Sequence, residues 1–288
     1  MNVEKSINLL KMVGLTPKEI LRYDIDVVDD LLYHTKDFKS GTIQIGGNLN
    51  IEFDGSIYKF HKLKQDDRYI YSFRQNRKNG SSNCIVIIID PLLKYAYLEN
   101  ISNVTGCFEK GKVIDKDGDR LVRLAMEVLR KIKSKHEITH ILLRDNSMKT
   151  INTYNITLRY LSYLTKGRTY YNKFGFIPCD TKPDGTIVVD KDRTKELLKQ
   201  SKWYLSLDTN DIKYDQNKLY NFINKTQHHL VKLFIENMNE YSGKFKEFVK
   251  KISYDYKFSP ILDDLLKYFV RSLKLDIPHR LCLKIFDE

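Results

Sequence analysis

The chain has 288 residues, of which 42% are hydrophobic and 30% charged, and its formal net charge is +12. This composition is typical of a globular protein with one large or two modest domains, and it excludes a disordered chain. No apolar run approaches the roughly 18–20 residues of a membrane helix and the N-terminus lacks a signal peptide's apolar core, so we expect an intracellular, cytoplasmic protein without membrane contact.

Residues 1–40 are predicted to form a helical N-terminal segment. Apolar residues recur there at near-helical spacing. The run Thr16-Pro17-Lys18-Glu19 combines an N-cap, a proline at the first helical position and a glutamate two residues later. A second helix is therefore expected to begin at this point.

Residues 41–110 alternate between apolar and polar side chains, which predicts a meander of antiparallel strands. Asp54-Gly55 is a strong hairpin turn. The continuous apolar run Cys84 to Ile89 predicts a strand that is buried on both faces, and Asp90-Pro91 ends it. A further strand is expected from Tyr95 to Val104.

Residues 111–190 are predicted to mix helices and strands. A polar loop with one glycine, Gly118, leads into a helix with a wide apolar stripe from Leu121 to Ile132. The later elements that we expect are a buried strand at 138–143, a helix that Gly167 closes, an aromatic strand and turn at 170–177, and a strand at 187–189.

Residues 191–288 lack strand alternation, and their apolar residues recur at helical intervals. We expect an extended segment around Trp203, Leu205 and Leu207, then helices, one of which begins at Ser259-Pro260. The predicted domains are a helical segment at 1–40, an α/β domain at 41–190 and a helical C-terminal region at 191–288.

The cysteines and histidines do not suggest a metal site. Cys84, Cys107, Cys179 and Cys282 are far apart and form no CxxC pair, which predicts four separate buried thiols rather than a zinc site or a disulfide. The neighbours in the pair His228-His229 would diverge on a helix. The positive charge is spread along the whole chain and leaves nucleic acid open as a partner.

One segment resembles a known family. Tyr171-Asn172-Lys173-Phe174-Gly175-Phe176 is similar to the YxKxGF signature of GCN5-related N-acetyltransferases, and the preceding run 158–164 resembles that family's last core helix. The likeness covers roughly residues 42–180 in layout. It implies an α/β fold: a mixed, mostly antiparallel GNAT-like sheet with crossover helices, extended here by a helical C-terminal region. The segment is also similar to variants in proteins of large DNA viruses, which would place it in a virion or the host cytoplasm.

The resemblance also implies a mechanism. In this family acetyl-CoA lies where two neighbouring strands splay apart, and an amine of a protein or small molecule attacks its thioester. Tyr171 matches the tyrosine that often protonates the leaving thiolate. A carboxylate on the preceding strand, Glu99, would be the base, and Asn146 lies where the family often has an asparagine near the cofactor.

The pyrophosphate loop departs from the family's pattern, which is usually Arg/Gln-x-x-Gly-x-Gly/Ala. Alignment on Gly118 gives Asp115-Lys116-Asp117-Gly118-Asp119-Arg120, so an aspartate replaces the leading residue and an arginine replaces the second small residue. Glycine in such a loop lets the backbone approach a phosphate closely. The candidates for cofactor contact in this loop are Lys116, Gly118, Asp119 and Arg120.

Three functions stay open at this point. The first is acetyl transfer from acetyl-CoA to an amine, for which Tyr171 is retained. The second is a non-catalytic structural or interaction protein on the same fold, which the altered loop favours. The third is a basic accessory factor that binds nucleic acid, for which clustered lysines would be the sign.

Overall fold

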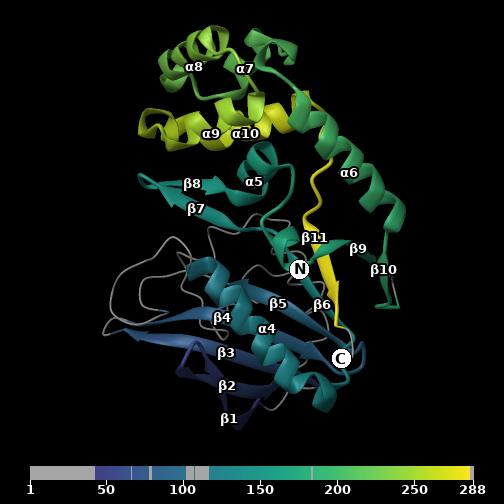
Figure 1. Ribbon diagram of the computed structural model, residues 1–288. Helices are drawn as coiled ribbons and strands as arrows, with labels where there is room; N and C mark the ends of the chain where they lie inside the picture. The colour runs from purple at the N-terminus through teal and green to yellow at the C-terminus, as the bar shows by residue number, and fades with distance from the viewer. Residues whose placement is uncertain are drawn as a thin grey trace, which may run out of the picture. The chain divides into compact units, whose positions relative to one another are not determined.

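The computed structural model describes residues 43–65, 67–77, 80–101, 107, 117–182 and 184–285. They belong to two compact units, which divide between Ile141 and Leu142 (Figure 1). The predicted helices of residues 1–40 lie outside the described residues. The domain boundary that we predicted near residue 190 falls inside the second unit rather than between the two.

The first unit contains an antiparallel meander, as the alternation predicted. Each strand pairs with the next one along the chain. The predicted hairpin is confirmed, because Asp54 and Gly55 both have positive φ, 49° and 70°, which suits the twist of a two-residue turn. The strands are β1 (Ile43–Phe53), β2 (Ser56–Gln65), β3 (Arg68–Arg77), β4 (Gly80–Asp90) and β5 (Tyr95–Ile101).

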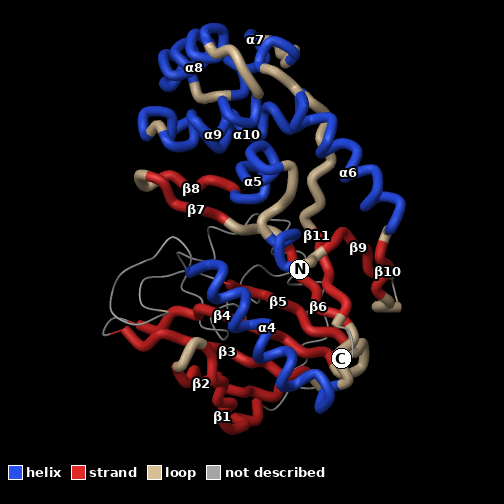
Figure 2. Tube along the Cα trace, in the orientation of Figure 1, coloured by secondary structure: helices blue, strands red, loops and turns tan. Residues whose placement is uncertain are grey.

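One helix, α4 (Asp117–His136), covers a face of this sheet (Figure 2). Its predicted apolar stripe is buried, and Lys131 Nζ on its outer side donates a hydrogen bond of 2.9 Å to the carbonyl of Asn50 on β1. The predicted burial of β4 on both faces is also confirmed, since Ile85, Ile87 and Ile89 on one face are each 0% exposed and Val86 on the other is 9% exposed. Burial of aliphatic side chains from both layers therefore holds the unit together.

The prediction of four separate thiols is wrong for one pair, because Cys84 and Cys107 form a disulfide. Cys84 lies on β4, and Cys107 follows β5, the antiparallel neighbour of β4, so the fold brings together residues that are 23 positions apart. Cys179 and Cys282 are free and buried, as predicted. Since reducing compartments keep most thiols reduced, the disulfide weighs against the predicted cytoplasmic location.

The second unit combines short strands with helices. Its larger set has the order β6-β11-β9-β10, so the last strand of the chain lies between two that come much earlier. We had predicted a helical C-terminal region at 191–288, but the strand β11 shows that this region is not wholly helical. The strands are β6 (His140–Arg144, which begins at the division), the hairpin β7 (Met148–Ile151) and β8 (Tyr154–Thr157), β9 (Ile177–Thr181), β10 (Ile187–Val189) and β11 (Arg280–Lys284).

The aromatic segment that we predicted as a strand and turn at 170–177 is a 3₁₀ turn at Tyr171–Phe174, and the strand β9 begins only at Ile177. The side chain of Asn172 fixes this turn, since its Oδ1 accepts hydrogen bonds from the backbone N–H and the hydroxyl of Thr169, and its Nδ2 donates to the carbonyl of Phe176. Gly175 then adopts φ 88°, a left-handed conformation that glycine takes up without strain. Local hydrogen bonds thus outweigh the strand preference of the aromatic residues.

The helices of the second unit enclose an aromatic core. Phe245 and Phe269 lie at its centre, with ring centroids 5.1 Å apart. Helix α6 includes Trp203 and Leu205, which we had predicted to be extended; Tyr204 between them is buried and donates a 2.6 Å hydrogen bond to the carbonyl of Leu164. The helices are α5 (Leu158–Lys166), α6 (Lys191–Ser206), α7 (Gln216–Phe222), α8 (His228–Glu240), α9 (Phe245–Tyr254) and α10 (Ser259–Ser272), with short 3₁₀ turns at 209–211, 225–227 and 256–258.

The coarse fold class is as predicted, an α/β protein. Antiparallel pairing joins the consecutive strands from β1 to β5, β7 to β8, and β9 to both β10 and β11. None of the helices in the described ranges has the length and apolar character required to cross a membrane.

Candidate functional site

Glu99 occupies a β-bulge on β5. Val86 pairs with Asn100 and Ile87 pairs with Leu98, so Glu99 is the extra residue between them. Bulges often re-aim a side chain next to an active site. Part of Glu99 is exposed, yet burial of its carboxyl group raises the pKa to about 7. A carboxylate with this pKa is suited to take up a proton near neutral pH.

The start of α4 contains the other candidates of the first unit. Gly118, Asp119 and Arg120 lie in the first turn of the helix rather than in a loop, and all three are half-buried. Backbone N–H groups in a first turn have no partner within the helix and are suited to an anion. Lys116 lies outside the described residues.

Arg120 points to the β1–β2 hairpin. Its Nε donates to Asp54 Oδ2 at 2.9 Å and its terminal nitrogen donates to the hydroxyl of Tyr58 at 3.1 Å. These contacts fasten the first turn of α4 to the end of the sheet. They give Arg120 a structural role that the sequence did not suggest and compete with the predicted role in binding a cofactor.

Tyr171, in the second unit, is only 8% exposed. Its ring makes edge contacts with Tyr170 and Phe176, with centroids 5.1 and 6.0 Å away. Burial, and secondarily the negative charge of Asp145, raise the pKa of Tyr171 above its usual value. The phenol therefore stays protonated at neutral pH and is suited to donate a proton rather than to accept one.

Asp145 is the functional candidate that sequence reasoning missed. Its Oδ1 accepts hydrogen bonds from the backbone N–H and the hydroxyl of Ser147, while its buried Oδ2 has no hydrogen-bond partner. Burial raises the pKa of Asp145, and the hydrogen bonds from Ser147 and, to a smaller extent, the positive charge of Arg159 oppose this. The sequence signal that could have identified Asp145 is its position, since it is a carboxylate directly after the buried strand β6. We had instead selected the next residue, Asn146, whose side chain is exposed.

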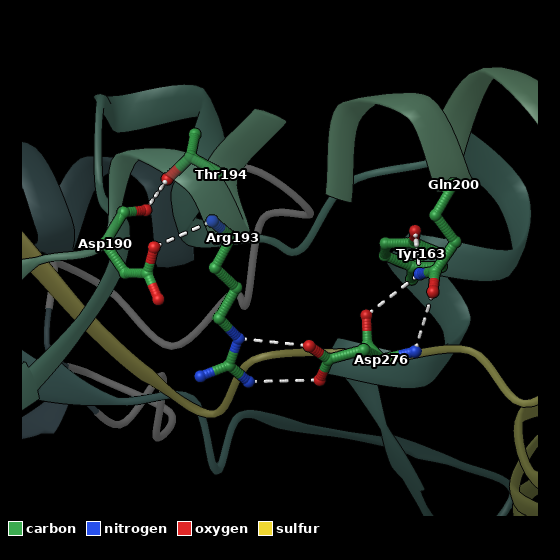
Figure 3. Close-up of polar contacts among 6 residues, drawn as sticks. All are labelled: Tyr163, Asp190, Arg193, Thr194, Gln200 and Asp276. Carbon is green, nitrogen blue, oxygen red and sulfur yellow. Dashed lines mark hydrogen bonds and ion pairs between the residues drawn. The ribbon is translucent and has the colours of Figure 1, made fainter. Parts of the chain in front are cut away.

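A shallow pocket of about 380 Å³ lies beside α6. Arg193 forms a bidentate ion pair with Asp276, and the Gln200 amide bonds to both backbone groups of Asp276 and to the hydroxyl of Tyr163 (Figure 3). These contacts fix α6 to the segment before β11 and leave few polar groups for a ligand. The lining residues, none of which we predicted, are Arg193, Glu196, Leu197, Lys199, Gln200, Trp203 and Asp276.

Metal ligands do not gather in the part of the chain that the structure describes, where no three His, Cys, Asp or Glu side chains come together. Comparisons of the chain with known protein families, with curated proteins and with solved structures find no match. The functional argument therefore rests on the residues themselves.

Proposed function

We propose that this chain is an N-acyltransferase of the GNAT type, which transfers an acetyl group from acetyl-CoA to an amine. The observation that carries the proposal is Glu99, a carboxyl group with a pKa of about 7 at a bulge in the strand that precedes the long helix α4. This combination is unusual for a purely structural residue, because an ordinary strand carboxylate is solvated and ionised at neutral pH.

The proposed chemistry assigns one proton transfer to each of two residues. Glu99 accepts a proton from the ammonium form of the acceptor, so that the neutral amine can attack the thioester carbonyl carbon. The new C–N bond forms, the C–S bond breaks, and the CoA thiolate takes a proton. Protonation of the thiolate is the role that the family resemblance gives to Tyr171, a residue of the second unit.

The first turn of α4 is the proposed contact for the cofactor's pyrophosphate. Its backbone N–H groups are suited to anions, and Gly118 has no side chain that would keep the backbone away. The substitution Gly118→Trp should therefore abolish acetyl-CoA binding, measured by calorimetry. Absence of acetyl-CoA binding to the unaltered protein at millimolar concentration would overturn the proposal.

Activity is tested with acetyl-CoA and a panel of amines. Glu99→Gln should lower kcat by about 10²–10⁴-fold and remove the rise of activity with pH around 7, since general base catalysis contributes on this order. Glu52→Gln, which alters an exposed carboxylate on β1, is the control. Equal activity of the two variants would remove Glu99 from the mechanism.

Tyr171→Phe provides a separate test, with Tyr154→Phe on the exposed hairpin as its control. Loss of activity with unchanged acetyl-CoA binding is expected if the phenol protonates the thiolate.

A non-catalytic role on the same fold is the second candidate, and the contacts of Arg120 favour it. The guanidinium occupies the first turn of α4 and is tied to Asp54 and Tyr58. Binding of acetyl-CoA without turnover of any amine would support this alternative.

A further inference from the structure

Two strongly exposed aromatic side chains of the second unit lie close together where α9 ends. Tyr254, the last residue of α9, is 72% exposed, and Tyr256, the first residue of the 3₁₀ turn that follows, is 67% exposed. In the described part of this unit, no other large apolar side chain has an exposed fraction as high. Single exposed apolar residues are ordinary on a protein surface, but two such rings only two positions apart require a reason.

Packing of the core does not explain these rings. The apolar face of α9 is formed by Phe245, Phe248 and Ile252, which are at most 3% exposed. Phe258, two residues after Tyr256, is 0% exposed. Within the described ranges, neither tyrosine has a ring contact or a side-chain hydrogen bond. The two rings are therefore open to solvent on both sides of a segment whose core positions are already filled.

Lysines surround the tyrosines. Residues three and four apart on a helix are neighbours, so Lys250 and Lys251 both lie beside Tyr254, and Lys246 lies one turn before Lys250. Lys250 and Lys251 are exposed, and Lys251 Nζ lies 5.6 Å from the ring centroid of Tyr241. A cation–π contact of this kind attracts an ammonium group without neutralising it. None of the three lysines has an ion-pair partner among the residues that the structure describes.

Local structure accounts for the two acidic residues of the run 244–257. Asp255 accepts a hydrogen bond from the backbone N–H of Lys257 and pairs with its Nζ at 3.0 Å. Glu247 lies in the first turn of α9, where the helix dipole favours a negative charge. The same run contains five lysines, so its positive charge exceeds its negative charge. The dipole also favours a lysine in the last turn of α9, but it does not explain two exposed tyrosines there.

We propose that Lys250, Lys251, Tyr254 and Tyr256 form a binding surface for single-stranded nucleic acid. Ammonium groups attract the phosphates, and unpaired bases stack on aromatic rings that are open to solvent. Two Cα–Cα steps of about 3.8 Å keep the backbones of the two tyrosines within about 7.6 Å of each other, so neighbouring nucleotides can reach both rings. A duplex is disfavoured because its bases are already stacked on one another.

A membrane surface fits these residues less well. Helices that lie on a membrane insert an apolar face between the lipids. The apolar face of α9 is buried in the protein core, and only the face with Lys250 and Lys251 is exposed. Single-stranded nucleic acid instead uses exposed charges and flat rings, which are the groups that this surface offers.

The test is fluorescence anisotropy of the full chain with labelled oligothymidylate and, separately, oligouridylate of about 12 nucleotides at several salt concentrations. Tyr254→Ala and Tyr256→Ala should each weaken binding by about five- to a hundredfold, because each removes a ring on which a base stacks. Tyr254→Phe keeps the ring and should bind like the unaltered protein. Lys250→Gln and Lys251→Gln should each lower the slope of log Kd against log salt by about 0.7.

Matched controls keep the test independent of folding and of general charge. Lys195→Gln alters an exposed lysine on α6 and should leave the salt slope unchanged. Urea unfolding checks that each variant is folded, and the two alanine variants should keep their stability because both rings are exposed. The surface uses none of the residues of the acyltransferase proposal, so a failure of either proposal leaves the other intact.

Several outcomes would overturn the surface. They are an absence of salt-dependent binding to either oligonucleotide, equal affinity for a duplex of the same length, and equal losses in Tyr254→Phe and Tyr254→Ala. Tyrosine-dependent binding of phosphatidylserine vesicles in place of both oligonucleotides would overturn it as well. Stronger binding of one oligonucleotide than of the other would support the surface and identify DNA or RNA as its ligand.

Discussion

The first unit and the helical part of the second are stabilised in different ways. In the second unit, phenylalanines from several helices pack together, as Phe234, Phe248 and Phe258 do around Phe245 and Phe269. In the described part of the first unit, a sheet carries the helix α4, and the carboxyl group of Glu99 is buried at a bulge in β5. Apolar packing dominates the helical core, whereas the sheet contains a buried carboxyl group where chemistry is proposed.

The same contrast appears within the second unit. Its strand-bearing part contains Asp145, a buried carboxylate with one unpartnered oxygen, close enough to Tyr171 to influence the tyrosine's pKa. Leaving a buried polar atom unpartnered costs about 1–3 kcal/mol.

The largest change in the free energy of unfolding is expected from a substitution in the aromatic core. Phe245→Ala should lower the free energy of unfolding of the second unit by about 3–5 kcal/mol, because the ring is 0% exposed and its removal leaves a cavity. Trp203, the only tryptophan, lies in this unit, so its fluorescence during urea unfolding follows the change. Tyr254→Ala on the same helix, at a residue that is 72% exposed, is the control. Similar losses for both variants would contradict the assigned core.

The disulfide should affect the stability of the first unit alone. Cys107→Ala should lower the stability of that unit by about 3 kcal/mol, because the cross-link spans 23 residues and restricts the unfolded chain. Hydrogen exchange measured by mass spectrometry would locate the loss. A reducing agent should bring the unaltered protein to the level of the variant, and it should destabilise Cys179→Ala, which keeps the disulfide, by the same amount as the unaltered protein. An unaltered protein that does not respond to reduction would show that the bond does not form.

The ionisation of Glu99 should make the stability of the first unit depend on pH. Its folded pKa of about 7 lies above its ordinary value of 4.5, so the folded state loses stability as pH rises through this interval. Glu99→Gln removes this penalty and should stabilise the first unit by about 1–3 kcal/mol at pH 8. The difference should vanish below about pH 4.5, where the carboxyl is protonated in both states. Thermal unfolding across this range checks the sign, and a destabilised variant at pH 8 would refute the buried carboxylate.

The smallest change in the free energy of unfolding is expected from substitutions at the surface of the second unit. Arg193→Ala removes the bidentate pair with Asp276, but both side chains are well exposed, so the loss should be about 1 kcal/mol or less. Lys195→Ala, which removes a pair on the same helix with Asp192, should cost still less. A loss above 2 kcal/mol at Arg193 would mean that the pocket residues beside α6 hold the unit together more than their exposure indicates.

The sequence by itself determined the local structure where one physical signal dominated. The alternation of residues and the Asp54-Gly55 turn specified the meander, and the apolar stripe from Leu121 to Ile132 specified α4, because side-chain period follows backbone geometry. It failed where signals competed: Asn172 turned an aromatic run into a 3₁₀ turn, and the packing of Tyr204 kept Trp203 helical. The motif selected Tyr171 and Glu99, and their roles stay predictions.

Only the tertiary structure decided which distant residues meet. It joined Cys84 to Cys107, buried Asp145 close to Tyr171, and tied Arg120 to the β1–β2 hairpin. Such contacts depend on strand register and on how a helix lies across a sheet. Neither is encoded in the spacing of residues along the chain, so sites assembled from separate elements appear only once the chain is folded.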